Sequence, residues 1–159
     1  MFRSMRRKAR QLSAAESEQI IRDASSGVLA VYGDDGYPYA VPVSHVYTDG
    51  KIVFHCAREG HKIDSIRRNE KVSFCVIAFG RARIVEDEAG LRRIAGLIGE
   101  KFSHDYPEDC LKETDEVIAH NRMYCVEIEV DHITGKCAKE VMVERKRRQH
   151  MNMGVLQHR

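Results

Sequence analysis

Residues 46–54 read VYTDGKIVF, and they contain the strongest local structural signal in the chain. Apolar and β-branched residues stand on both sides of Asp49-Gly50, a dipeptide that readily adopts the left-handed backbone of a two-residue hairpin turn. The pattern predicts one strand that ends near Thr48 and a second that begins at Lys51. The sheet that contains this hairpin is therefore expected to be at least partly antiparallel.

Further strands follow one another on both sides of the hairpin. Strand-like composition marks the segments 28–32, 37–47, 51–56, 71–85 and 123–130, and a last extended segment is expected at 137–143. Helical spacing marks fewer segments, namely 13–25, 61–68 and 87–102. The polar segment 103–121 is expected to contain a loop and a short helix. Because strands succeed one another without alternating helices, the order argues against a parallel doubly wound sheet. It predicts a mainly β protein, an antiparallel barrel with peripheral helices.

Two strand-like segments carry features that restrict their place in the sheet. Pro38 and Pro42 lie within 37–47, and proline cannot donate a hydrogen bond to a neighbouring strand. This strand is therefore expected at an edge, at a bulge, or beside something other than a strand. The run 71–85 would span roughly 50 Å as a single strand at about 3.3 Å per residue, which is longer than strands usually are.

Helix ends are also marked in the sequence. Ser13 and Glu16 have the spacing of a capping box, which predicts a helix that begins there. Gly27 is expected to end that helix. Asp87 is expected to cap the helix that runs to about Phe102.

The composition fits one globular domain. The chain has 159 residues, of which 43% are hydrophobic and 31% charged, with 26 basic and 24 acidic side chains. This balance gives no reason to expect a nucleic-acid or membrane partner. The basic N-terminus has no apolar segment behind it and is not expected to be a signal peptide. We expect one domain over residues 1–143 and a charged tail over 144–159.

The cysteines point to a reducing compartment. The chain contains an odd number without CxxC spacing, namely Cys56, Cys75, Cys110, Cys125 and Cys137. A disulfide framework or a structural zinc site is therefore not expected. Reduced thiols and a cytoplasmic location fit this pattern better.

The segment that follows the hairpin could bind an anion. Arg58, His61 and Lys62 lie around Gly60, where a strand ends and a helix is expected to begin. The first turn of a helix offers free N–H groups and the positive end of the dipole. Basic side chains oppose that dipole unless an anion is present, so the stretch favours a phosphate site. A solvated basic loop is the alternative.

Other constellations are less specific. His45, His55 and His61 match no standard zinc spacing, so no metal site is expected. His55 and Cys56 are neighbours in a strand and point to opposite faces, which argues against a paired nucleophile and base. The basic run at 144–148 is interpreted as a solvated tail.

Six segments follow a known pattern in the same order: MRRKAR at 5–10, GYPYAVPVS at 36–44, KIVFHCA at 51–57 with GHK at 60–62, NEKVSF at 69–74, FGRARIVED at 79–87 and HITGK at 132–136. Together they resemble the FMN-binding split-barrel family related to pyridoxamine 5'-phosphate oxidase, in particular its nitroimidazole-resistance branch. The resemblance extends from about residue 5 to residue 140.

The resemblance implies a six-stranded antiparallel split β-barrel that forms a homodimer, with FMN in clefts at the subunit interface. It implies flavin contacts from Ala40, Val41, Pro42, Val43, Ser44 and His45. It places His55 and Cys56 where the next strand meets the flavin, and His61 and Lys62 at the FMN phosphate. His55 matches the histidine that lies beside the flavin in this branch, so it is the candidate catalytic residue.

Two departures from the family pattern affect the expected activity. Pyridoxamine-phosphate oxidases usually carry basic residues where this chain has Ala40 and His45, so vitamin B6 oxidation is not expected. Relatives also place a turn and a longer segment before the motif that begins at Phe79, whereas here residues 76–78 lead straight into it. The far wall of the flavin cleft is therefore expected to differ.

With these departures, the resemblance implies an FMN-dependent oxidoreductase that reduces a small, electron-poor compound such as a 5-nitroimidazole. A flavin-binding protein without enzymatic activity is one alternative. A second is a haem protein on the same barrel, with His45, His55 or His61 as the axial ligand. A nucleic-acid-binding protein that uses the basic residues within 3–10 and 145–148 is the third, and the near-zero net charge argues against it.

Overall fold

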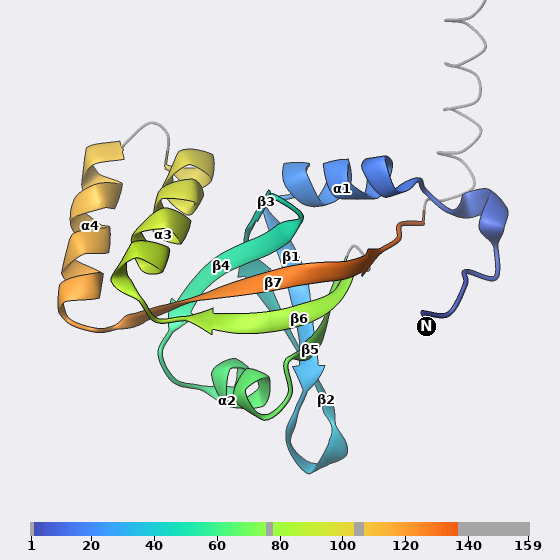
Figure 1. Cartoon of the computed structure of the whole chain (residues 1–159), viewed down its shortest axis with the longest axis horizontal. Helices are drawn as coiled ribbons and strands as arrows, with labels where there is room; N and C mark the ends of the chain where they lie inside the picture. The colour runs from blue at the N-terminus through green and yellow to red at the C-terminus, as the bar shows by residue number, and fades with distance from the viewer. Residues whose placement is uncertain (1, 76–77, 104–106, 137–159) are drawn as a thin grey trace, which may run out of the picture.

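The computed structural model describes residues 2–75, 78–103 and 107–136 (Figure 1). Its helical elements are η1 Lys8–Arg10, α1 Ala14–Asp23, η2 Asp34–Gly36, α2 His61–Arg68, α3 Glu88–Phe102 and α4 Pro107–Ala119. Its strands are β1 Ser26–Tyr32, β2 Pro38–Ser44, β3 Val46–Thr48, β4 Lys51–Ala57, β5 Lys71–Cys75, β6 Ala78–Val85 and β7 Met123–Ile133. The expected extended segment at 137–143 and the charged tail at 144–159 lie outside the described residues.

The strands form one curled antiparallel sheet in the order β2-β1-β5-β6-β7-β4-β3 (Figure 1). This is the mainly β split barrel that was expected, with peripheral helices, although it has seven strands instead of six. Segment 71–85 forms two strands, and segment 37–47 is interrupted at His45. Its first part, β2, pairs with β1, whereas its second part, β3, pairs with β4.

The predicted hairpin at Asp49-Gly50 is confirmed. Thr48 pairs with Lys51, and both turn residues have positive φ, 49° at Asp49 and 73° at Gly50. Positive φ at both central residues matches the type I′ geometry that this dipeptide favours.

The run 71–85 is not one strand. It forms the antiparallel pair β5–β6, in which Lys71 pairs with Arg81 and Phe74 with Ala78. The chain reverses between Phe74 and Ala78 without a glycine or proline. Pairing lets each segment satisfy the backbone groups of the other, which one overlong strand could not do. No long segment separates the two strands, in line with the short spacing before Phe79.

Strand β2 lies at an edge of the sheet, as its prolines predicted. It pairs with β1 from Ser26 to Tyr32, and no strand of the described chain pairs with its other side. Proline is compatible with this position because an edge strand forms a ladder on one side only.

The capping residues predicted the start of two helices correctly. Ser13 accepts a hydrogen bond from the Glu16 amide, and the Glu16 carboxylate accepts one from the Ser13 amide. Asp87 caps α3 through the Gly90 amide. The role predicted for Gly27 is wrong, because α1 ends at Asp23 and Gly27 lies in β1, where any side chain would collide with the Phe74 ring.

Two apolar clusters lie on the two faces of the sheet. Inside the curl, the core includes Leu29, Ile52, Phe54, Phe74 and Val126. On the outer face, α3 covers a second cluster that includes Val53, Val85, Leu91, Ile94 and Cys125. Alternation along β4 therefore sends Ile52 and Phe54 inward and Val53 toward α3.

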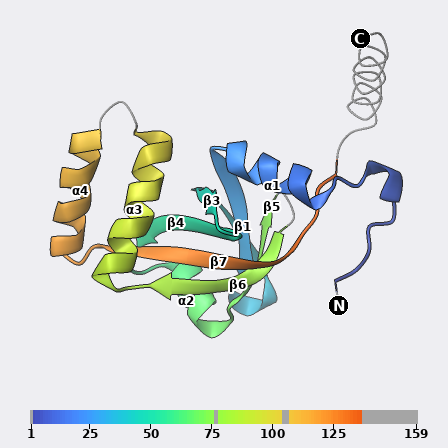
Figure 2. The same ribbon diagram turned by 45° about the horizontal axis from the view of Figure 1, so that its top comes forward.

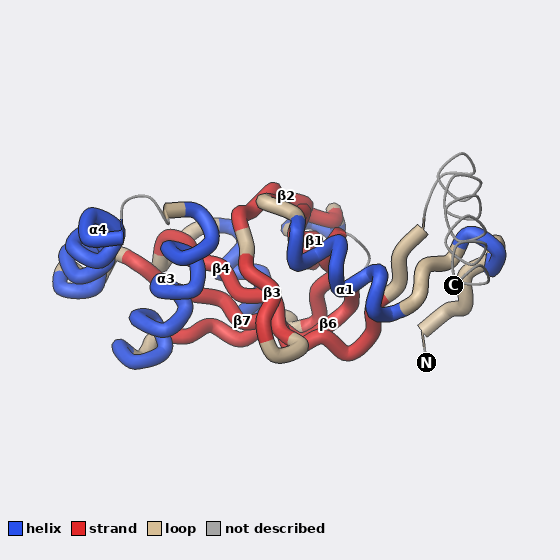
Figure 3. The backbone as a smooth tube through the Cα atoms, turned by 90° about the horizontal axis from the view of Figure 1, so that it is seen from above, coloured by secondary structure: helices blue, strands red, loops and turns tan. Residues whose placement is uncertain are grey.

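The helices sit around the sheet rather than within it. Helix α2 packs against β1 and β6, and α1 against β3. Helices α3 and α4 lie side by side (Figure 2) and occupy the end of the molecule opposite the N-terminal segment (Figure 3). No helix in residues 2–75, 78–103 and 107–136 is long and apolar enough to cross a membrane.

Candidate functional site

The interruption of the edge strand leaves a split in the barrel. Strand β4 pairs with β3 only from Lys51 to Val53, whereas β7 pairs with it from Lys51 to Ala57. Among the described residues, no strand pairs with this edge of β4 beyond Val53, and none pairs with the outer edge of β2. Ser44, at the end of β2, and His55 to Ala57, at the end of β4, line the same cleft. Free N–H and C=O groups of two strands are therefore available near one concave site.

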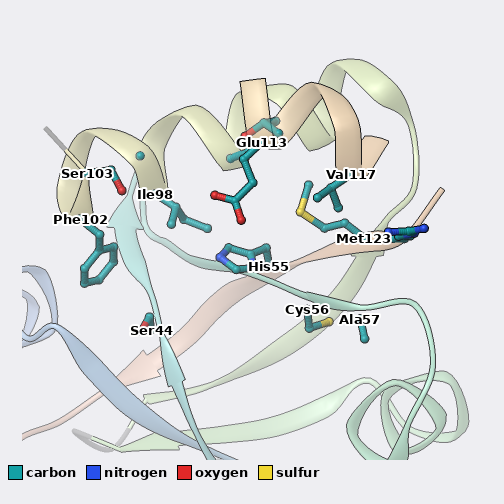
Figure 4. A pocket seen from close by; sticks show the side chains of 14 residues that line it. Ser44, His55, Cys56, Ala57, Ile98, Phe102, Ser103, Glu113, Val117 and Met123 are labelled. Atoms are coloured by element: carbon teal, nitrogen blue, oxygen red, sulfur yellow. The ribbon is translucent and has the colours of Figure 1, made fainter. Parts of the chain in front are cut away.

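The cleft has a volume of about 540 Å³ and lies between the sheet and the α3–α4 pair (Figure 4). Its apolar walls include Ala95, Ile98, Phe102, Val117 and Met123. Its polar lining includes Ser44, His55, Ser103, Glu113 and Arg122. An apolar cleft with a few polar groups is typical of sites that bind a flat organic molecule.

His55 is the predicted catalytic residue, and its ring opens onto this cleft. It lies on the same face of β4 as Val53, and Figure 4 shows its ring between the strand and α4. Burial by the surrounding walls lowers the pKa of His55, while the Glu113 carboxylate opposes that shift. A neutral imidazole is therefore favoured near neutral pH, with a carboxylate available to support its charged form.

The residues predicted on β2 divide between the two faces of the strand. The side chains of Ala40, Pro42 and Ser44 are exposed. The side chains of Val41 and Val43 pack against the barrel core, so only their backbone could contact a ligand.

His45 is almost fully buried, with 1% of its surface exposed. Its Nε2 lies 2.9 Å from the carbonyl oxygen of Ile21, and its ring meets Phe74 edge-on. Burial lowers the pKa of His45, so the neutral ring donates to the C-terminal end of α1. The side chain of His45 is thus structural, and sequence reasoning missed this because it could not assign the strand break to this residue.

Cys56 points to the opposite face of β4 from His55, as strand alternation predicts (Figure 4). Burial raises the pKa of the Cys56 thiol, and the nearby Lys62 charge opposes that rise. Burial also raises the pKa of Cys125 to about 12. Cys56, Cys75 and Cys125 are free thiols, and the side chains of Cys110 and Cys137 lie outside the described part of the chain.

The start of α2 has the features of an anion site. Gly60 stands at the N-cap with φ of 111°, and no side chain caps the helix. His61 stacks on Tyr39 with 4.1 Å between ring centroids, and its Nε2 lies 3.2 Å from a carboxylate oxygen of Asp34. Lys62 forms no ion pair with any described residue. The first N–H groups and Lys62 could therefore receive a phosphate.

Arg58 does not join this phosphate site. Its guanidinium donates to the Tyr124 hydroxyl at 2.8 Å and to the Asn121 carbonyl oxygen at 3.2 Å. It also lies over the Tyr124 ring. Arg58 thus fixes the loop that leads to α2 instead of facing an anion.

The three histidines that were considered as metal or haem ligands lie apart. The His45 ring lies against the Ile21 carbonyl oxygen in α1, and the His61 ring stacks on Tyr39. Of the three, His55 is the one that opens onto the cleft. Within the described ranges, no group of three His, Cys, Asp or Glu side chains is placed to hold a metal ion.

Sequence reasoning missed the wall opposite His55. Segment 103–121 was expected to contain a loop and a short helix, but α4 extends from Pro107 to Ala119. Glu113, Thr114 and Val117 lie on one face of α4 and line the cleft. Thr114 and Val117 follow Glu113 by one and four residues, a spacing that places the three side chains on one side of a helix. A polar helix, however, gives no indication of which face of the sheet it covers.

Comparisons with known proteins agree with this geometry. A family profile described as pyridoxamine 5'-phosphate oxidase matches residues 13–137. The search of curated proteins found no match.

Several solved structures share the fold. A conserved hypothetical protein from Mycobacterium tuberculosis is 23% identical, with a TM-score of 0.71 over 84% of this chain and 90% of the other. A candidate 5-nitroimidazole antibiotic resistance protein from Bacteroides thetaiotaomicron is 19% identical, with a TM-score of 0.63 over 78% and 85% of the two chains. An FAD-binding protein from Mesorhizobium loti is 25% identical, with a TM-score of 0.54 over 79% and 94%.

The family profile spans most of the chain, including the split between β2 and β4 and the start of α2. The chain therefore belongs to the pyridoxamine 5'-phosphate oxidase family.

Proposed function

We propose that this protein binds FMN along the split of its barrel and uses it to reduce a small, electron-poor compound such as a 5-nitroimidazole. The observation that carries the proposal is one cleft lined by the end of β2 at Ser44 and the end of β4 at His55 to Ala57, with the uncapped start of α2 following after a three-residue connection. The names of similar structures support it, since they include an FAD-binding protein and a candidate nitroimidazole resistance protein.

The residues of the cleft suit a flavin in three ways. The apolar walls, which include Ile98 and Phe102, can cover a planar ring system. Free backbone groups of β2 and β4 can pair with the polar edge of that ring. Lys62 and the first N–H groups of α2, which follow Ala57 after a three-residue connection, can hold the phosphate. Bound flavin would supply the electrons of the reaction.

The chain itself would supply a proton and a shielded site. Conversion of a nitro group to a nitroso group consumes two electrons and two protons and releases one water molecule. His55 can donate one of these protons from its ring, because it opens onto the cleft. The α3–α4 pair covers one side of this site.

Titration of the full-length protein with FMN and with riboflavin tests the binding site. We expect Lys62→Ala to weaken FMN roughly ten- to hundredfold, because a charge-assisted hydrogen bond to phosphate is lost. Riboflavin, which has no phosphate, should bind the variant and the parent equally. Lys112→Ala, which changes an exposed lysine on α4, is the matched control. The flavin proposal fails if FMN does not bind, and the phosphate assignment fails if Lys62→Ala binds FMN like the parent.

Turnover separates an enzyme from a flavin-binding module. With a chemical reductant and a 5-nitroimidazole, the parent protein should consume more than one equivalent of nitro compound per flavin, and His55→Asn should do so more slowly. If reduction stops after one equivalent of nitro compound per flavin, a role in flavin binding or sensing is supported instead.

A further inference from the structure

A carboxylate faces His55 across the cleft. Strand β4 contributes His55 and helix α4 contributes Glu113, and both side chains line the same space. Figure 4 shows the Glu113 carboxylate directed from α4 toward the His55 ring. The two residues are far apart in sequence, so the tertiary fold alone brings them together.

The position of Glu113 is fixed by the packing of α4 on α3. Asp115, two residues further along α4, forms an ion pair with Arg92 on α3, and Arg92 also pairs with Glu88 at 3.0 Å. Thr114 and Val117 complete the α4 face that lines the cleft. Glu113 is therefore presented to the cleft by a helix that is anchored to its neighbour.

Few other charged groups face His55. The residues of α3 that line the cleft are uncharged, and β7 contributes Met123. Cys56 lies on β4, next to His55, and burial raises the pKa of its thiol. Arg122, which follows α4, is the other charged side chain of the cleft. Burial lowers the pKa of His55, and Glu113 raises it. His55 makes no hydrogen bond to any described residue, so Glu113 is the group placed to influence its charge.

We propose that Glu113 is a positioning residue for His55: its carboxylate offsets part of the effect of burial, so that more of the cleft-facing imidazole is protonated and can act as a proton donor. This inference rests on the proposed function for the use of that proton. The imidazolium transfers one ring proton to an oxygen of the bound compound and becomes neutral. It then regains a proton from solvent, and the Glu113 carboxylate stays ionised throughout.

The test measures the pKa of His55 directly by NMR titration of the full-length protein, with His55→Gln to assign its signal. We expect Glu113→Gln to lower the pKa of His55 by about half a unit to one unit, because a nearby carboxylate favours the charged ring. Glu113→Asp should retain part of the effect. Glu116→Gln, on the same helix but outside the cleft lining, should leave the pKa of His55 unchanged.

The outcomes separate this inference from the proposed function. An unchanged pKa of His55 in Glu113→Gln overturns the positioning role, even if FMN binds normally. A lowered pKa in the absence of any FMN binding supports the electrostatic pair while removing the proposed use of its proton. If both hold, the alkaline limb of the pH profile for nitro reduction, where His55 loses the proton that it donates, should move with the pKa of His55.

Discussion

At the scale of single residues, Glu127 shows how the sheet tolerates a buried charge. It is 5% exposed, and its two carboxylate oxygens accept hydrogen bonds from Lys51, Arg83 and Arg93 at 2.9–3.0 Å. Burial alone would raise the pKa of Glu127, but hydrogen bonds from these three cations lower it to about 2. The residue joins β4, β6, β7 and α3 through one carboxylate.

The low pKa of Glu127 predicts a loss of stability in acid. The unfolded chain takes up a proton near the ordinary value of 4.5, whereas the folded protein does so near about 2. The stabilisation is thus fully present above pH 4.5 and is lost as pH falls through about 2. At pH 7, Glu127→Gln should lower the free energy of unfolding by roughly 3 kcal/mol.

Urea unfolding at several pH values measures this contribution. The difference between the parent and Glu127→Gln should shrink as the pH falls. Glu129→Gln is the control, since Glu129 lies on the same strand with 63% of its side chain exposed and pairs with Arg81. Glu129→Gln should lower the free energy of unfolding by less than about 0.5 kcal/mol. Equal effects of the two substitutions at pH 7 would contradict the buried network.

Individual histidines show where sequence reasoning reached its limit. His45 and His55 stand in similar apolar strand segments, yet one is a buried helix cap and the other opens onto the cleft. The difference arises at the break between β2 and β3, which changes the face that the following residues present. Only tertiary pairing determines where that break falls, so the family resemblance placed both histidines at the flavin.

At the scale of elements, Lys101 anchors one helix to another. Its ammonium donates to the carbonyl oxygens of Arg22, Ala24 and His45 at 3.0, 2.6 and 3.0 Å. These groups lie at the C-terminal end of α1 and at the break after β2. Burial lowers the pKa of Lys101. One side chain of α3 thus caps α1 and holds the corner of the edge strand next to the cleft.

Lys101→Met keeps the apolar stem and removes the donor. We expect it to lower the free energy of unfolding by about 1–3 kcal/mol, because partly buried carbonyl groups lose their partner. Amide hydrogen exchange in the last turn of α1 should accelerate more than exchange in β6. Lys112→Met, at an exposed position of α4, should do neither. If α1 exchanges as slowly in Lys101→Met as in the parent, the cap contributes little.

Elements with local chemical signals were predictable. The capping box at Ser13, the cap at Asp87 and the turn at Asp49-Gly50 each depend on a few adjacent residues, and the structure confirms all three. The β5–β6 reversal has no such signal, because apolar residues continue across it. Helix α4 likewise gains its place from Asp115 and its contact with α3, which no short sequence pattern reports.

At the scale of the whole molecule, apolar surface remains exposed on the β1–β2 hairpin. Val28, Tyr32 and Tyr37 are 38%, 65% and 76% exposed. A groove of about 500 Å³ nearby is lined by residues that include Phe2, Tyr32 and Phe79. We propose that a second copy of the chain covers this face. Such patches commonly mark protein interfaces.

The oligomeric state can be measured by size-exclusion chromatography with light scattering. We expect a mass twice that of the 18.2 kDa chain. Tyr32→Lys should shift the mass toward the monomer, because it places a charge in the apolar interface. Ile20→Lys, which changes an exposed apolar residue of α1, should not. A monomeric parent protein would contradict the proposed dimer.

The place of β7 in the sheet has a consequence for synthesis on the ribosome. This last described strand, Met123–Ile133, lies between β6 and β4 and joins the two parts of the sheet. Before it emerges from the exit tunnel, the β3–β4 hairpin has no connection through the sheet to β1, β5 and β6, and Glu127 is not yet available to the cations around it. A nascent chain therefore leaves the facing edges of β6 and β4 unpaired until β7 has left the tunnel, and chaperones that recognise extended apolar segments have their longest opportunity to bind during that interval.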